Sequence, residues 1–280
     1  MMNDYMKQIL RFCFALSIIF LLVGKWAPLY AQLKEPPVRA ASNPVTPLKK
    51  GVKNRVGGGI LLSNFGFGVS GTYAHVLAPF TELTFTTNIT GIRYASQQSI
   101  INFSVFGGTR KIIPNKYNRA LGFPFLFGIK QRIFPRQVSD NFRFFVAASG
   151  GPALSLVFPY INDADHNGYR STAIQQTKYG NIRYFTERKR GFFAALGHAS
   201  AHIGIAGSLK MGIDFGSKFK TQPTFEIGYF FYYFNPGLQI MDPKRPVYNN
   251  SGQVVGRTNF YGPKKYFGTP EITFKFSSWW

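Results

Sequence analysis

The sequence predicts an all-β protein, a transmembrane antiparallel up-and-down β-barrel of about eight strands. Residues 198–217 alternate between apolar and small or polar residues, which is the period of a strand with one oily and one wet face. This segment is longer than the ~5–6 residues of ordinary strands and suits the ~9–11 residues of a strand that crosses a bilayer. Aromatic residues make up 17% of the chain, yet the mean hydropathy is only -0.06. That combination is typical of a barrel whose lipid-facing and lumen-facing residues alternate.

Residues 1–31 are predicted to be an export signal rather than part of the fold. Lys7 and Arg11 precede an apolar run at 12–23, and a small residue stands before a predicted cut at Gln32. The alternative is a retained N-terminal anchor, but the apolar run is short for crossing a bilayer. We therefore expect cleavage and export.

The composition of the mature chain narrows the classes of function. The single cysteine, Cys13, lies in the predicted signal, so disulfides, thiolate metal sites and a cysteine nucleophile are excluded from the mature chain. Loss of the signal removes three basic residues and one acidic residue, which lowers the formal charge from +22 to +20. This excess predicts attraction to polyanions. For an exported protein these are lipopolysaccharide phosphates, anionic polysaccharide and the membrane surface, and nucleic acid is not expected.

Four strands are expected after a proline-containing, basic stretch at 32–55, which we interpret as a flexible periplasmic linker. Their ranges are 56–63, 67–77, 81–93 and 121–134. The first is the least regular, and the strand count depends on it. The third alternates most clearly, with Leu83 and Ile89 on the side opposite Glu82.

The second half of the chain predicts four more strands with the same alternation. They are 142–158, 198–217, 224–234 and 266–280. Long connections at 94–120, 159–190 and 235–263 lie at one rim, and mostly short turns lie at the other. An even strand number with this asymmetry is typical of bacterial single-chain barrels, and a closed ring leaves no unpaired edge in hydrocarbon.

Charged residues on the wet faces of the strands are expected to form a network in the lumen. A barrel of this size is filled with side chains, and an unpaired ion there is costly, so opposite charges should pair. We interpret the network as a structural plug, with a gate or proton path as the alternative. Its predicted members are Glu82, Lys130, Arg132, Arg143, Lys210, Asp214, Glu226, Glu271 and Lys275.

His198 and Ser200 are the main hint of catalysis. Two residues apart on a strand, they share a face, as a base and its nucleophile would. The pair resembles the His-x-Ser pair of small outer-membrane lipid A deacylases, although here it is expected to point inward. Asp214 is about 50 Å further along an extended strand, so Glu187 or His202 would have to be the partner of His198. A polar lumen lining is the favoured interpretation, and a lipid hydrolase is the alternative.

Residues 163–168 match the first half of a calcium-binding loop. Asp163, Asp165 and Asn167 alternate as oxygen ligands do, and Gly168 permits the sharp turn. The acidic residue expected at the twelfth position is Ile174. A calcium-ordered outer loop is therefore one hypothesis, and a hairpin turn is the other.

Basic residues gather in the long connections. They either neutralise phosphates of neighbouring lipopolysaccharide, which we favour, or form a docking surface for an anionic ligand or partner. Neutralising the 183–190 cluster would separate the two readings. The residues are Arg183, Arg188, Lys189, Arg190, Lys244, Arg245, Lys264 and Lys265.

The C-terminal segment FKFSSWW resembles the signature by which the barrel-assembly machinery recognises outer-membrane barrels, although two serines precede its final tryptophans. Residues 56–280 resemble the small eight-stranded outer-membrane barrels of the OmpA, OmpX and OmpW type. Segments 113–115, 140–143 and 266–270 are similar to outer-membrane proteins of Bacteroidota-like bacteria. The resemblance implies a fold and a location in the outer membrane, and it implies no activity.

Together these features predict a signal at 1–31, a periplasmic linker at 32–55 and a monomeric outer-membrane barrel at 56–280. We expect a non-enzymatic protein with a structural, adhesive or membrane-organising role, which contacts outer-membrane lipid and lipopolysaccharide. The alternatives are a lipid A-modifying hydrolase, a small-solute pore and a component of an envelope or secretion complex. No cofactor is expected apart from the calcium considered above.

Overall fold

The computed structural model describes residues 44–280 except 95–96, 98–99, 104–108, 178–179 and 217–218. For 100–103, 109–112, 172–177 and 180–184 it describes the backbone alone. The predicted signal and residues 32–43 of the predicted linker lie outside the described residues.

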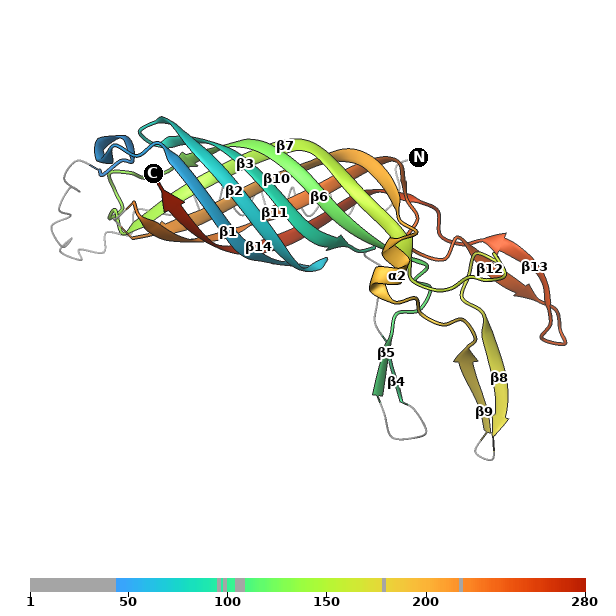
Figure 1. Ribbon diagram of the computed structural model, residues 1–280. Coiled ribbons are helices and arrows are strands. Elements are labelled where there is room, and N and C mark those ends of the chain that lie inside the picture. Colours follow the sequence, from blue (N-terminus) through green and yellow to red (C-terminus); the bar gives the residue numbers. More distant parts are fainter. Residues whose placement is uncertain (1–43, 95–96, 98–99, 104–108, 178–179, 217–218) are drawn as a thin grey trace, which may run out of the picture. The chain divides into compact units, whose positions relative to one another are not determined.

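Eight antiparallel strands close into a barrel, as the alternation predicts (Figure 1). The order around the ring is β1-β14-β11-β10-β7-β6-β3-β2, so each barrel strand lies beside the barrel strand that follows it along the chain. Closure pairs the first strand with the last. The strands are β1 (Asn54–Ser63), β2 (Gly66–Ala78), β3 (Thr81–Ile92), β6 (Asn118–Arg132), β7 (Phe142–Pro159), β10 (Ser200–Phe215), β11 (Thr221–Leu238) and β14 (Lys264–Trp279).

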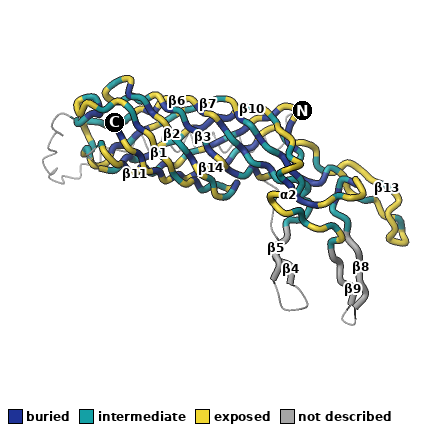
Figure 2. Tube along the Cα trace, in the orientation of Figure 1, coloured by how far each residue is buried: buried dark blue, intermediate teal, exposed yellow. Residues whose placement is uncertain are grey.

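Burial alternates along the strands with a period of two (Figure 2). In β14 every residue from Glu271 to Trp280 follows this rule, with odd-numbered side chains buried in the barrel and even-numbered ones exposed on its outer surface.

Several expected strand limits are wrong. The strand β1 begins at 54 and not at 56, β6 spans 118–132 and not 121–134, and β11 spans 221–238 and not 224–234. The strand β10 begins at Ser200 and not at His198, because the short helix α2 (Phe192–Leu196) and a turn precede it.

The barrel has two different ends. At the inner end, where Asn54 and Trp280 lie, the connections between strands are short. At the outer end, β1 and β2 meet in a tight turn, and the other three connections are long and contain hairpins of their own. These hairpins are β4 (Ile100–Phe103) with β5 (Thr109–Ile112), β8 (Thr172–Thr177) with β9 (Gly180–Phe185), and β12 (Lys244–Tyr248) with β13 (Val254–Asn259). No helix in the described ranges is long and apolar enough to cross a membrane.

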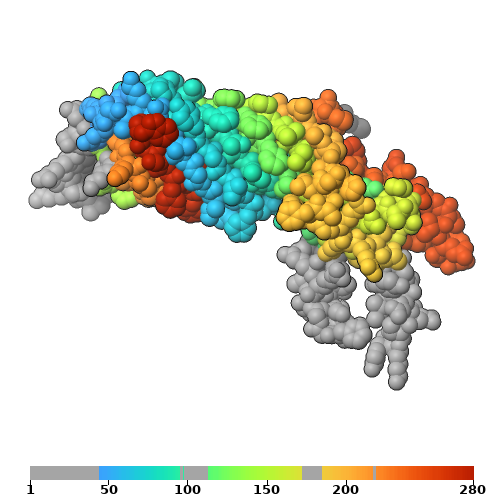
Figure 3. Space-filling view, in the orientation of Figure 1, coloured from blue at the N-terminus to red at the C-terminus, as the bar shows by residue number. Residues whose placement is uncertain are grey.

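The closing seam joins β1 to β14 over nine residue pairs, from Arg55 opposite Trp279 to Ser63 opposite Glu271. In the space-filling view the two ends of the described chain lie against each other along this seam (Figure 3). The strand with the weakest sequence pattern therefore completes the ring, because its backbone pairs with β2 on one side and β14 on the other.

The last part of the predicted linker is held at the inner end. A 3₁₀ turn, η1 (Leu48–Lys50), follows Val45, whose N–H donates to Asp140 over 2.9 Å. The Val45 carbonyl accepts a hydrogen bond from Arg132 over 3.2 Å. Residues 44–53 thus have defined contacts with the barrel, in contrast to the flexible stretch expected from their composition.

Candidate functional site

The inner half of the lumen contains a first group of buried ion pairs. The guanidinium of Arg55 lies 2.7 Å from Glu82 and 3.5 Å from Asp214. Asp214 also accepts a hydrogen bond of 2.6 Å from Lys130 and one of 2.7 Å from the Thr224 hydroxyl. Two carboxylates and two cations are thereby neutralised where water is largely excluded.

A second group lies further along the same wall. Lys210 pairs with Glu271 and, at 3.6 Å, with Glu226, and Lys275 reaches Glu226 at 2.8 Å. The side chains come from β10, β11 and β14, which are consecutive in the ring. The shared acceptor Glu226 holds two cations from different strands, so the group ties the three strands together.

Two of the expected lumen cations lie apart from these groups. Arg132 is at the inner rim, where it pairs with Asp140 at 2.8 Å. Arg143 is buried, and within the described residues its guanidinium has no ion pair and instead lies 4.3 Å from the centre of the Phe219 ring. The structure thus brings Glu82, Lys130, Lys210, Asp214, Glu226, Glu271 and Lys275 into ion pairs in the lumen.

Arg55 is the member of the network that the sequence did not point to. We assigned it to the linker because a basic run precedes it. The side chains of Val56 and Ile60 are exposed on the outer face of β1. If the alternation of the strand is extended by one residue before Val56, Arg55 falls on the inner face.

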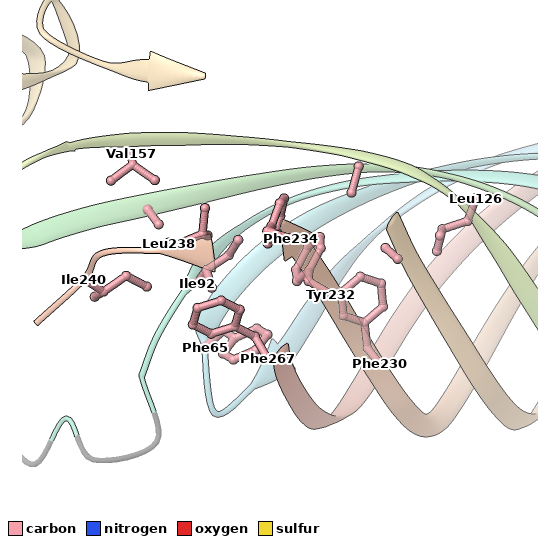
Figure 4. Packing of buried hydrophobic residues seen from close by; sticks show 13 residues of the cluster. Phe65, Ile92, Leu126, Val157, Phe230, Tyr232, Phe234, Leu238, Ile240 and Phe267 are labelled. Carbon is pink, nitrogen blue, oxygen red and sulfur yellow. The ribbon is translucent and has the colours of Figure 1, made fainter. Parts of the chain in front are cut away.

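The outer half of the lumen is aromatic (Figure 4). Phe230, Tyr232 and Phe234 follow one another on the inner face of β11 and pack with Phe65 and Phe267. The Phe230 and Tyr232 ring centres are 4.6 Å apart, nearly perpendicular, and Tyr232 stacks on Phe234 at 5.6 Å. Gly122 on β6 leaves room for the Tyr232 ring, because a Cβ there would overlap the phenol. The expected polar lining therefore ends half way along the barrel.

The space left inside the barrel is small. A cavity beside Arg143 and Asp214, and another beside Lys210 and Glu226, each measure about 30 Å³. Each has room for only a small number of water molecules. A larger hollow of about 530 Å³ lies between the 44–49 segment and Phe80, outside the lumen.

His198 and Ser200 do not form a pair in the structure. His198 lies in the turn after α2, where it is exposed, and Ser200 is the first residue of β10. The Ser200 hydroxyl donates to the carbonyl of Val157 over 3.2 Å and lies 3.2 Å from the Nε2 of His202. Within the described residues, no carboxylate forms an ion pair with His202.

The 163–168 segment forms a closed turn. Asp163 accepts hydrogen bonds from the N–H groups of Asn167 and Gly168, each over 3.0 Å, and from the Tyr117 hydroxyl over 2.8 Å. Asn167 accepts from the N–H of Tyr169, and Asp165 is exposed. The described part of the chain contains no group of three or more metal-ligating side chains arranged for an ion. The calcium site stays a prediction.

Two further carboxylates, the buried Asp242 and the half-buried Glu187, lie near this turn. Burial raises the pKa of Asp242 to about 7, against the effect of a backbone hydrogen bond from Arg170. Burial also raises the pKa of Glu187, and the charge of Asp163 adds to the increase for both groups. The outer loops thus contain Asp242, whose pKa is near neutral, and Glu187, whose pKa is raised above its ordinary value.

The predicted polyanion-binding residues are spread over the outer end. Arg188, Lys244, Arg245 and Lys265 are exposed, whereas Lys189, Arg190 and Lys264 are half-buried. The side chain of Arg183 lies outside the described residues. None of the seven described side chains forms an ion pair with a described carboxylate.

Comparison with known proteins gives similar structures and no similar sequences. No protein-family model and no curated protein matches the chain. Neisserial surface protein A is 7% identical, with 81% of this chain and 94% of that chain covered and a TM-score of 0.31. The attachment invasion locus protein of Yersinia pestis is 7% identical over 82% and 97%, with a TM-score of 0.30. A major outer membrane protein from Thermus thermophilus is 9% identical over 82% and 99%, with a TM-score of 0.38.

Proposed function

We propose that this chain is a non-catalytic barrel of the bacterial outer membrane whose basic outer loops bind polyanionic glycolipid and thereby organise the surrounding leaflet. The observation that supports the proposal best is the asymmetry of the barrel. Eight of its described charged side chains are paired inside the lumen, whereas seven described basic side chains at its outer end form no ion pair with a described carboxylate. These are Arg188, Lys189, Arg190, Lys244, Arg245, Lys264 and Lys265.

The outer surface of the strands supports the proposed location in a membrane. Large apolar side chains that face outward remain exposed, among them Phe127, Leu209 and Phe276 with 58%, 68% and 66% of their surface accessible. A soluble protein rarely exposes so continuous an apolar surface, whereas a lipid-facing wall requires one. Exposed aromatic rings lie toward both ends of the strands, as in the interfacial girdles of membrane barrels. They include Phe142 and Trp280 toward the inner end and Tyr233 and Tyr266 toward the outer end.

A small-solute pore has less support. The aromatic cluster fills the outer half of the lumen, the ion pairs occupy the inner half, and the lumen cavities measure about 30 Å³ each.

A hydrolase likewise has less support. The Ser200 hydroxyl already donates to a backbone carbonyl, and the described residues offer His202 no acid partner of the kind that a triad uses to orient its base.

The proposal is tested in two steps with purified protein. Unboiled protein should migrate differently from boiled protein on a detergent gel, since a closed barrel resists detergent until it is heated. Folded protein should then bind lipopolysaccharide with an affinity that falls as salt increases. Replacing Lys244, Arg245 and Lys265 by Gln should weaken that binding, while Ser200→Ala should leave it unchanged. Binding that is insensitive to salt and to these substitutions would overturn the proposal.

A further inference from the structure

Three cationic side chains surround one tyrosine ring at the outer rim. The ammonium groups of Lys116 and Lys189 lie 5.2 Å and 5.4 Å from the centre of the Tyr160 ring, and the guanidinium of Arg119 lies 5.0 Å from it. Lys116 and Lys189 come from two separate outer connections, and Arg119 is the second residue of β6. Cation–π attraction to a single ring stabilises each cation, but it neutralises none of them.

This group of Lys116, Arg119, Lys189 and Tyr160, which we call the rim cluster, lies on the outward side of the wall. In β6 the inward residues are even-numbered, such as Leu126 and Lys130, so Arg119 belongs to the outward set. Its partner across the ladder is Phe158 on β7. Phe158 is also in the outward set, and it is buried because Phe192 of α2 packs on it with ring centres 5.4 Å apart.

The rim cluster has a surplus of positive charge. Within the described residues, no carboxylate forms an ion pair with its cations, and the buried Nη1 of Arg119 has no hydrogen-bond partner. Burial lowers the pKa of Lys116 to about 8, and the neighbouring charges of Arg93, Arg119 and Lys189 add to that decrease. Bringing like charges together in a partly buried place is unfavourable unless an anion compensates them.

Exposed apolar side chains lie on the outward face near the outer end of the barrel. Phe193, three residues after Arg190, has 85% of its surface accessible, and Phe192 beside it has 44%. Ile203, at the outer end of β10, is 78% accessible. An outward cationic group at the same end of the barrel as exposed rings and an exposed aliphatic side chain suits the depth at which headgroups meet acyl chains.

We propose that the rim cluster binds a phosphate group of a glycolipid in the leaflet that surrounds the outer end of the barrel. A phosphate carries up to two negative charges and several acceptor oxygens, which match an arginine fork and two ammonium groups. The outward orientation and the exposed rings favour a membrane lipid over a soluble phosphate or a sulfated glycan. This inference rests on the proposed function and names one lipid site within it.

The test uses the folded full-length protein in phosphatidylcholine vesicles that contain lipid A or its dephosphorylated form. Lipid retained by the protein is counted after extraction in mild detergent by native mass spectrometry. We expect the Arg119→Gln, Lys189→Gln double variant to retain about tenfold less lipid A than the wild type, the effect of losing roughly one charge-assisted hydrogen bond. The dephosphorylated lipid should bind both proteins equally weakly.

The matched control is the Lys49→Gln, Lys50→Gln double variant, which loses the same charge from exposed positions in η1, at the opposite end of the barrel. It should retain lipid A as the wild type does, and both variants should keep the heat-dependent gel shift. Equal losses in the two variants, equal retention of dephosphorylated lipid by the wild type, or competition by inorganic phosphate at equal concentration would overturn the rim site. If lipid A binding is insensitive to all of these substitutions and to salt, both the rim site and the proposed function are wrong. If salt and the outer-loop substitutions weaken lipopolysaccharide binding while the rim variant retains lipid A, the rim site alone is wrong.

Discussion

At the scale of single residues, Asp214 has the most contacts in the inner lumen. It forms ion pairs with Lys130 and Arg55 and accepts a hydrogen bond from Thr224, and these residues come from three other strands. Replacing it by Asn should leave buried positive charge without compensation. We expect a loss of about 3–5 kcal/mol in unfolding free energy, measured as the urea midpoint of the barrel in detergent.

Two further variants make this prediction specific. Asp165→Asn removes the same charge from an exposed loop position and should change the midpoint little. Asp214→Leu with Lys130→Met removes both partners and should recover much of the loss, because Arg55 keeps Glu82. If Asp214→Asn unfolds at the wild-type midpoint, the ion pairs do not stabilise the barrel.

Asp242 predicts a pH dependence in the outer loops. Its pKa in the folded protein is about 7, above the ordinary value of 3.8, so the folded loops bind more protons than the unfolded ones between these values. Loop stability should therefore fall as the pH rises from about 4 to 7 and change little above 7. Hydrogen exchange, corrected for intrinsic rates, should show this at the amide of Tyr261, which donates to the Asp242 carbonyl over 3.2 Å.

Asp242→Asn provides the control, since it keeps an acceptor oxygen and cannot ionise. Its amide exchange should show little of this dependence between pH 5 and 8. Glu187 and Asp163 lie near Asp242, and the raised pKa of Glu187 leaves a smaller residual slope in the variant. If the loop stability of the wild type does not change with pH, or rises between about pH 4 and 7, the pKa assigned to Asp242 is wrong.

At the scale of elements, β1 depends on glycine. A Cβ on Gly59 would overlap the backbone carbonyl of Phe274 on β14, whereas a Cβ on Gly58 would meet only the Ser70 carbonyl, at 3.7 Å. Gly59→Val should therefore disturb the closing seam and cost about 1–3 kcal/mol, while Gly58→Val, on the exposed face, should be tolerated. The temperature at which the gel shift disappears would measure both.

Equal behaviour of the two glycine variants would mean that the seam between β1 and β14 adjusts to a larger side chain.

The barrel strands were predictable from the sequence, because inward and outward side chains alternate residue by residue along each of them. The outer hairpins were not predictable. Segments such as 244–248 are exposed on both faces and carry no clear alternation, so their pairing depends on the turn between them.

At the scale of the whole molecule, the filled lumen predicts a non-conducting barrel. Protein reconstituted in planar bilayers should give no stable, large conductance steps, since aromatic side chains and ion pairs occupy the two halves of the lumen. A porin measured in the same bilayers shows that insertion and recording work. Reproducible steps from the wild-type protein would require the lumen contents to move.

The candidate site was predictable in part. Alternation alone predicts nine lumen charges, and the structure brings seven of them into ion pairs there. Arg55 was missed because the expected first strand began two residues too late. The aromatic outer lumen was missed because both faces of the strand around Tyr232 carry large rings, so alternation does not distinguish them. The rim cluster carries no sequence signal, since Lys116 and Lys189 are far apart along the chain.

The amino-acid pattern alone thus accounts for the closed barrel, for a strand number of about eight and for the side of the wall on which most strand residues lie. All three follow from a period of two, which is a local property of the backbone. The pattern does not show which charges meet, nor where the outer connections bring their cations together. Pairs such as Arg55 with Glu82 depend on the register between strands. The meeting of Lys116 and Lys189 at Tyr160 depends on how the connections fold back over the rim. Contacts between distant segments determine both.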